Sequence, residues 1–175
     1  RTIRTEEHLS TRLPLIVRQS VQQTLPRALV FGAPPGVLGP AYELRSGPGE
    51  DCGIWGTRTD TPDSLQNIKV GSRRSEFDDR LHVDHSNDII INKRMASAFH
   101  ETNLPSVLNF HGVDTIVLTG GSTSGCVRAT VVDSLSHSFR TVVAEECVAD
   151  KHESPHFANL YDIAIKYADV VPAQD

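Results

Sequence analysis

From residue 88 onward, short apolar runs alternate with segments in which apolar residues recur at helical spacing. The apolar runs are rich in β-branched residues and have the length of buried strands; they cover residues 88–92, 115–119 and 141–144. We therefore predict a strand at each of these places.

The segments after these runs carry apolar residues three or four positions apart, which predicts helices. The first helix is expected to end at Gly112, and the third to begin at Ser154-Pro155, a pair typical of a helix start. We expect each helix to bury one face. The positions that mark these faces are Leu104, Val107, Leu108 and His111; Val127, Val131, Leu135 and Phe139; and Phe157, Leu160, Ile163, Ala164 and Tyr167.

Strands that alternate with helices at this pace form parallel βαβ units, with helices packed on both faces of the sheet. The pattern therefore predicts an α/β fold with three layers, α/β/α, around a mainly parallel sheet. A length of 175 residues is that of one domain, so we assign residues 1–175 to a single domain.

The first 87 residues follow a less regular pattern. A helix is predicted after Leu13-Pro14 and a strand over residues 28–31, whereas residues 32–51 are dense in glycine and proline and predict a long loop. Residues 60–84 are polar, and we interpret their charges as a solvated face.

Composition narrows the class of protein. With 38% apolar and 22% charged residues the chain is globular, and its net charge of −5 offers no basic surface for nucleic acid. No apolar run approaches the roughly 20 residues of a membrane-spanning helix. The three cysteines, Cys52, Cys126 and Cys147, are an odd number at irregular spacing. They argue against a disulfide framework and for a reducing, cytoplasmic compartment.

Cys126 is the candidate nucleophile. It follows a strand and a turn of small residues, Gly120 to Gly125, and it opens a helix. Such a turn exposes a side chain at the carboxyl edge of the sheet, and the helix N-terminus favours a thiolate. The alternative is a buried structural cysteine, and the turn alone leaves the two interpretations about equal. Cys147, beside two glutamates, and Cys52, in a loop region, are interpreted as passive.

Several motifs resemble the isochorismatase-like cysteine hydrolases, over about residues 52–171. They are Lys93-Arg-Met-Ala-Ser-Ala-Phe99 with Thr102 and Leu104, Gly112-Val-Asp-Thr-Ile-Val-Leu-Thr-Gly120, and Ser122-Thr-Ser-Gly-Cys-Val-Arg-Ala-Thr130 with Asp133. The tail, with Cys147-Val-Ala-Asp-Lys151, His156, Asn159-Leu160 and Lys166-Tyr-Ala-Asp-Val170, resembles the N-carbamoylsarcosine amidohydrolase branch, and Trp55-Gly-Thr57 fits a further family segment. Residues 1–51 are atypical of the family.

The resemblance implies a catalytic triad of Asp, Lys and Cys, in which Cys126 is the nucleophile and Lys93 the lysine. It further implies a cis peptide bond between Gly121 and Ser122, and an oxyanion hole formed by the amides of Ser122 and Cys126. The expected activity is hydrolysis of a small linear amide or N-carbamoyl compound through a thioacyl-enzyme, with release of ammonia. By residue type alone, Lys93 would be a solvated lysine, but its expected place at the end of the strand over residues 88–92 favours the site.

Substrate contacts are expected from Lys151, Thr123, Phe99 and Trp55. Lys151 matches a position where the family branch has a basic residue suited to a substrate carboxylate, and a loop lysine in water is an equal alternative. Phe99 and Trp55 can line the pocket, although buried aromatic residues more often belong to the core. Arg128 is interpreted as structural.

The aspartate of the triad has no match in this chain. In the family it ends the first strand, whereas residues 1–12 offer Glu6 and Glu7 but neither an aspartate nor an apolar strand. In order of preference, the chain is a fragment truncated at its start, its amino-terminal coding region is misread, or it is a degenerate member. A catalytically inactive domain is therefore the alternative to the enzyme.

Other chemistries fit the sequence less well. An isochorismatase-type ether hydrolase does not need a thiol nucleophile, and a thiol redox protein would need a second cysteine nearby. The histidine pairs His82 with His85 and His152 with His156 lack the further ligands of a metal site, so we expect no metal and no cofactor. The expected partners are a small-molecule amide and further copies of the chain, in a homo-oligomer (dimer or tetramer).

Overall fold

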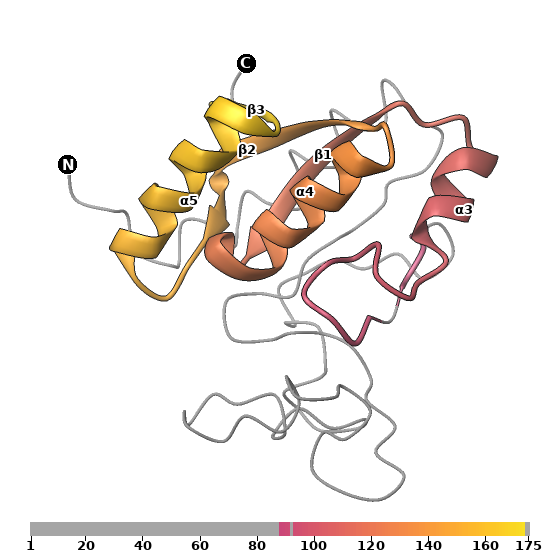
Figure 1. The fold of residues 1–175 in the computed structure, drawn as a ribbon, viewed down its shortest axis with the longest axis horizontal. Helices are drawn as coiled ribbons and strands as arrows, with labels where there is room; N and C mark the ends of the chain where they lie inside the picture. Colours follow the sequence, from indigo (N-terminus) through magenta and orange to yellow (C-terminus); the bar gives the residue numbers. More distant parts are fainter. Residues whose placement is uncertain (1–87, 92, 174–175) are drawn as a thin grey trace, which may run out of the picture.

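The computed structural model describes residues 88–91 and 93–173 (Figure 1). None of the helices in this part of the chain has the length and apolar content of a membrane-spanning helix. In chain order the elements are α3 (Leu104–Phe110), β1 (Thr115–Gly121), the π-helical turn η4 (Thr123–Val127), α4 (Arg128–Ser136), β2 (Arg140–Ala149), α5 (Glu153–Lys166) and β3 (Asp169–Val171).

The three strands form one parallel sheet in the order β1-β2-β3. Helix α4 connects β1 to β2, and α5 connects β2 to β3. Because both crossovers run in the same direction along the sheet, α4 and α5 lie on the same face, as Figure 1 shows. Their buried side chains meet those of the strands in one apolar cluster: Leu118, Val127, Val131, Val143, Val148, Leu160 and Ile163.

The pairing of β1 with β2 is interrupted near the end of β1. Leu118 pairs with Val143, and the next pair is Gly120 with Val148, so that one residue of β1 lies opposite four of β2. This irregularity is a bulge, of the kind often found beside functional sites. Beyond it, Gly121 pairs with Ala149, and both strands end together at their carboxyl edge.

Helix α3 ends in a turn that contains Gly112. Gly112 adopts a left-handed backbone (φ 63°), its amide donates to Asn109 O, and the amide of Val113 donates to Leu108 O. These two bonds form a Schellman motif, in which glycine is favoured because it has no Cβ. The stop predicted at Gly112 is confirmed. Around the helix lies a second apolar cluster, made of Ala98, Phe99, Leu104, Leu108, Val113, Ile116 and Phe139.

The strands predicted over residues 115–119 and 141–144 are confirmed, and both continue further than their apolar runs. The strand predicted over residues 88–92 is wrong: residues 88–91 form no strand, and Ile90 is 43% exposed. In the described part of the chain β1 is hydrogen-bonded to β2 alone, and a β-branched run becomes a strand only where a neighbour pairs with it. Ile91 instead packs against the cluster around α3.

The second helix ends earlier than its predicted apolar face. α4 stops at Ser136, Leu135 is 48% exposed, and Phe139 is buried beyond the helix end. The chain leaves α4 through a Schellman motif in which Ser138, with φ 68°, takes the left-handed position. The left-handed position usually holds a glycine, so a serine there does not reveal the helix end in the sequence. Phe139 is apolar and falls at helical spacing from Leu135, so the pattern places it on the helix although it lies beyond the end.

The third helix begins slightly before its predicted start. Its N-terminal cap position is His152 and its first residue is Glu153, so Ser154 and Pro155 lie inside the first turn. Leu160 and Ile163 are buried as expected, whereas Phe157 is half exposed. Helices α4 and α5, which follow β1 and β2, cover one face of the sheet. The helices predicted for the opposite face lie outside the described residues.

Candidate active site

The turn after β1 presents Cys126 at the carboxyl edge of the sheet. The Gly121–Ser122 peptide bond is cis, and the chain then enters η4, in which Cys126 is 9% exposed. The carbonyl of Ser122 accepts hydrogen bonds from the amides of Gly125 and Val127, at 3.1 Å each. These bonds fold the turn tightly around the cysteine.

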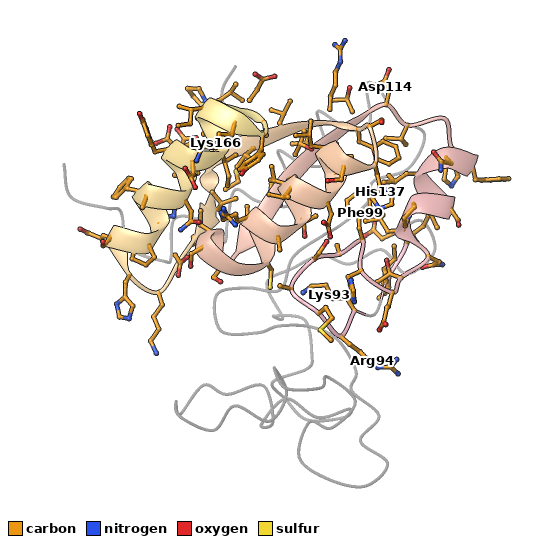
Figure 2. The ribbon with its side chains drawn as sticks, viewed as in Figure 1. Lys93, Arg94, Phe99, Asp114, His137 and Lys166 are labelled. Carbon is orange, nitrogen blue, oxygen red and sulfur yellow. The ribbon has the colours of Figure 1, made fainter. Side chains whose placement is uncertain are left out.

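Lys93 lies against this sulfur. Its Nζ is 3.4 Å from Cys126 Sγ, and it also donates to the carbonyls of Met95 at 3.0 Å and Ala96 at 3.1 Å. An ammonium group has three N–H donors, so these three acceptors use all of them. Figure 2 shows Lys93 on the loop that precedes α3. The backbone of the loop therefore fixes the Lys93 side chain, and the ammonium group lies beside the sulfur of Cys126.

Gly125 leaves room for the side chain of Ser122. A Cβ at this position would lie 2.6 Å from Ser122 Oγ, closer than carbon and oxygen atoms approach without bonding. We expect Gly125→Ala to displace Ser122 and to lower both the melting temperature and the reactivity of Cys126. Differential scanning fluorimetry and the rate of Cys126 alkylation measure the two effects. Gly112→Ala, where a Cβ meets nothing within 4 Å, is the control: its left-handed backbone costs stability and should leave the alkylation rate unchanged.

Asp150 holds the other side of the turn. One carboxylate oxygen, Oδ2, accepts from the amide of Ser124 at 2.6 Å, and Oδ1 accepts from the amide of Lys151 at 2.7 Å. The residue directly follows β2, so the carboxyl end of one strand supports the turn at the end of its neighbour.

A third contact joins the turn to α5. Thr123 is fully buried, and its Oγ1 lies 2.8 Å from Nδ1 of His156 in the first turns of α5. Asp150, directly after β2, and His156 of α5 thus hold two consecutive residues of the turn, Ser124 and Thr123, which come shortly before Cys126 in the sequence.

Comparison with known proteins assigns the family. The Isochorismatase domain matches residues 55–175, more than half of the chain. The chain belongs to the isochorismatase family. The resemblance and the α/β fold expected from the sequence are confirmed.

Two curated relatives of this isochorismatase-family chain are amidohydrolases. Maleamate amidohydrolase of Pseudomonas putida is 42% identical over 125 residues, which are 71% of this chain and 57% of the relative. N-carbamoylsarcosine amidase of an Arthrobacter species is 34% identical over 120 residues, 69% of this chain and 44% of the relative. The chain therefore spans about half the length of these two relatives.

A solved structure supports the same assignment. An isochorismatase-like hydrolase from Alkaliphilus metalliredigens superposes with a TM-score of 0.58 and 32% sequence identity, over 61% of this chain and 59% of that one. The parallel sheet and its covering helices are thus those of the isochorismatase-like fold.

The residues expected to contact substrate fall in different places in this family member. Thr123 lies in the turn itself, and the exposed Lys151 follows Asp150, whose carboxylate joins the backbone of Lys151 to that of the turn. Phe99 is 5% exposed and belongs to the cluster around α3, where its ring stacks on His137 with centroids 5.0 Å apart (Figure 2). This position favours the core interpretation of Phe99. Trp55 lies outside the described residues.

Arg128 follows Cys126 by two residues and is paired with helix α5. It forms an ion pair with Asp162 of α5 at 3.7 Å, in agreement with a structural role. Asp162 also accepts a hydrogen bond from Lys166, which lowers the pKa of its carboxyl group. Among residues 88–91 and 93–173, no group of three metal-binding side chains is found. His82, His85, Cys52, Glu6 and Glu7 lie outside the described residues.

Cys147 differs from Cys126 in its surroundings. It is 3% exposed inside β2, rather than at a strand end, and both cysteines are free thiols. Burial, with the adjacent Glu146 carboxylate as a second cause, raises the pKa of the Cys147 thiol. The thiol therefore stays protonated at neutral pH, as expected of a passive cysteine.

Sequence reasoning gave no role to Asp150 or to the pairing of His156 with Thr123. Both residues occur in the motifs that carried the family resemblance, but nothing in their spacing shows which backbone or side-chain groups they meet. Asp150 had one usable signal: a carboxylate directly after an apolar strand lies at the same sheet edge as the Cys126 turn.

Proposed function

We propose that this protein is a cysteine-dependent amidohydrolase that cleaves a small linear amide or N-carbamoyl compound and releases ammonia. The observation that carries the proposal is the 3.4 Å contact between Lys93 Nζ and Cys126 Sγ, at the carboxyl end of β1. A cation held at this distance stabilises a thiolate, which is the nucleophilic form of cysteine. Both curated relatives named above are amidohydrolases, which supports the same reaction class.

In the proposed reaction the sulfur of Cys126 attacks the carbonyl carbon of the amide. A carbon–sulfur bond forms, the carbon–nitrogen bond breaks, and the nitrogen takes up the proton that the thiol has given up and leaves as ammonia. Water then attacks the thioester, releases the acid and returns the thiol. Splitting the hydrolysis into two steps is the usual gain of nucleophilic catalysis.

The oxyanion of this reaction needs hydrogen-bond donors, and we assign this role to the amides of Ser122 and Cys126. The hydrogen bonding of the turn supports the assignment. The Ser122 carbonyl accepts from Gly125 and Val127, and among the described residues the Cys126 amide, which lies between these two donors, does not share that acceptor.

A direct assay tests the proposal. Purified full-length protein is incubated with maleamate and with N-carbamoylsarcosine, and ammonia release is followed before and after treatment with iodoacetamide. We expect ammonia from at least one of the two compounds, and loss of activity in step with alkylation of the Cys126 peptide, measured by mass spectrometry. Full activity after complete alkylation of Cys126 would contradict a thiol nucleophile.

Lys151 is proposed to bind the carboxylate that both test compounds carry. The Asp150 carboxylate joins the amides of Lys151 and Ser124, and so places the start of this loop beside the nucleophile turn. We expect Lys151→Ala to raise KM by about 10- to 100-fold with a smaller change in kcat, the size expected for one charge-assisted hydrogen bond. Lys166→Ala, which removes another exposed lysine, is the control. An unchanged KM in Lys151→Ala would show that this lysine does not bind the substrate carboxylate.

A second candidate is a catalytically inactive domain of the same family. The observation that favours it is the set of acceptors around Lys93. Within the described residues its ammonium donates to two carbonyls and a sulfur, and none of these acceptors is a carboxylate. The same assay separates the two candidates, since the inactive domain releases no ammonia from either compound and still alkylates at Cys126. An ether hydrolase is disfavoured by the paired thiol.

Assembly into a dimer or tetramer and a cytoplasmic location stay predictions. The free thiols of Cys126 and Cys147 are compatible with the reducing compartment that the cytoplasm provides. Size-exclusion chromatography with light scattering measures the assembly directly.

A further inference from the structure

Thr130 ties the nucleophile helix to the loop that carries Lys93. It is 4% exposed in the first turn of α4, and its Oγ1 accepts a hydrogen bond from the amide of Ala98 at 3.0 Å. The two residues are 32 positions apart in the sequence. Thr130 also lies four positions after Cys126, and the helical segment formed by η4 and α4 joins the two residues without a break.

Ala98 belongs to a loop that is bonded to itself and to α3. At one end, the Lys93 ammonium donates to the carbonyls of Met95 and Ala96. At the other, the hydroxyl of Thr102 donates to the carbonyl of Ala98 at 2.5 Å and accepts from the amide of Leu104, the first residue of α3. A displacement of Ala98 is therefore passed to the backbone that holds Lys93.

We propose that Thr130 is a positioning residue that sets the distance between the Lys93 ammonium and the Cys126 sulfur. The inference rests on the proposed function, in which this distance matters for the thiolate. In this proposal Thr130 does not contact the substrate. It accepts the hydrogen bond of the Ala98 amide and so fixes the position of the Lys93 loop relative to the helix that carries Cys126.

The chemistry of the bond makes Thr130 sensitive to one replacement in particular. Ala98 is 4% exposed, and the amide of a buried residue needs an acceptor. Valine has the shape of threonine but no acceptor, so Thr130→Val leaves the amide without its partner, and the loop moves to find another. Serine keeps the hydroxyl and loses only a methyl group. Thr130→Ser should therefore retain the position of Lys93.

The test compares Thr130→Val, Thr130→Ser and Thr141→Val in the full-length protein. Thr141 is the matched control, because it is also 4% exposed and its hydroxyl is bonded to Ser134 at 2.6 Å, inside the sheet–helix interface. We expect Thr130→Val to lower kcat for ammonia release by about tenfold or more while KM changes less than about twofold. Thr130→Ser should stay within about twofold of the parent in both constants.

The rate of Cys126 alkylation by iodoacetamide at pH 7, followed on the Cys126 peptide, is the second measurement. Thr130→Val should slow it by about tenfold, whereas Thr141→Val should leave it unchanged after a similar loss of melting temperature. This measurement needs no substrate, so it tests Thr130 even if the protein hydrolyses neither maleamate nor N-carbamoylsarcosine. A missing hydrolysis would overturn the proposed function and not the positioning role.

Three results would overturn the proposal. They are equal alkylation rates in Thr130→Val and Thr141→Val, a rise in KM without a fall in kcat, and failure of Thr130→Ser to retain the parent rate. If Thr130→Val does not fold, Thr130→Ala and Thr130→Ser are compared instead, since alanine removes the acceptor with no added bulk. Equal rates in that pair would be equally decisive against the proposal.

Discussion

Replacement of Cys126 by alanine is expected to abolish ammonia release, with a fall in kcat of about 10⁴-fold or more. The thiolate forms the bond that divides the reaction into two steps, and among the described residues Cys126 is the one side chain that the Lys93 ammonium contacts. Cys126→Ser is expected to be nearly as inactive, because a hydroxyl ionises far less readily than a thiol.

The measurement is the initial rate of ammonia release at saturating substrate, with circular dichroism to verify folding. Cys147→Ala is the matched control, because Cys147 is also a buried free thiol but lies inside β2, where its pKa is raised. We expect this control to keep the activity of the parent at a somewhat lower melting temperature. Turnover by Cys126→Ala at more than about one hundredth of the parent rate would refute nucleophilic catalysis by this residue.

Lys93→Met is expected to have the second largest effect, a fall in kcat of about 10²- to 10⁴-fold. Methionine has a similar length and no charge, so the sulfur loses its cation while two backbone carbonyls, of Met95 and Ala96, lose their donor. Lys93→Arg is expected to fail as well. A planar guanidinium cannot direct three donors at acceptors arranged around one nitrogen.

Alkylation of Cys126 measures the loss of the cation separately from turnover, and it should slow in both Lys93 variants. Arg94→Met provides the control, since Arg94 is the adjacent cation and is exposed. We expect parent-like alkylation and ammonia release from this control. If Lys93→Met alkylates as fast as the parent protein, the contact with the sulfur has no electrostatic role.

Much of the fold could be predicted because its signals are local. The apolar runs over residues 115–119 and 141–144 and the helical spacing before Gly112 each lie within one element. The predictions that were wrong concern features that depend on residues outside the element itself. Residues 88–91 needed a pairing neighbour, and the end of α4 depends on Ser138 in a backbone conformation that its residue type does not announce.

The candidate site divides in the same way. Cys126 and its small-residue turn form one contiguous segment, and their motif could be found in the sequence. The supports of this turn could not, because the bonds of Thr130 to Ala98, of Asp150 to Ser124 and of His156 to Thr123 join residues 26 to 33 positions apart. Which backbone amide a given side chain meets is decided by the packing of helices on the sheet, and apolar periodicity carries no information about it.

The bulge in the sheet has a consequence for the Cys126 turn. Had the pairing of Leu118 with Val143 continued without interruption, Gly121 would lie opposite Glu146, whereas the extra residues of β2 bring Ala149 to that place. Asp150 is therefore level with the turn because of the number of residues in the bulge. Removing one of them would draw Asp150 back by about 3.3 Å and turn its side chain to the other face of the sheet. The number of residues in β2, as much as their chemistry, determines which carboxylate reaches the amide of Ser124.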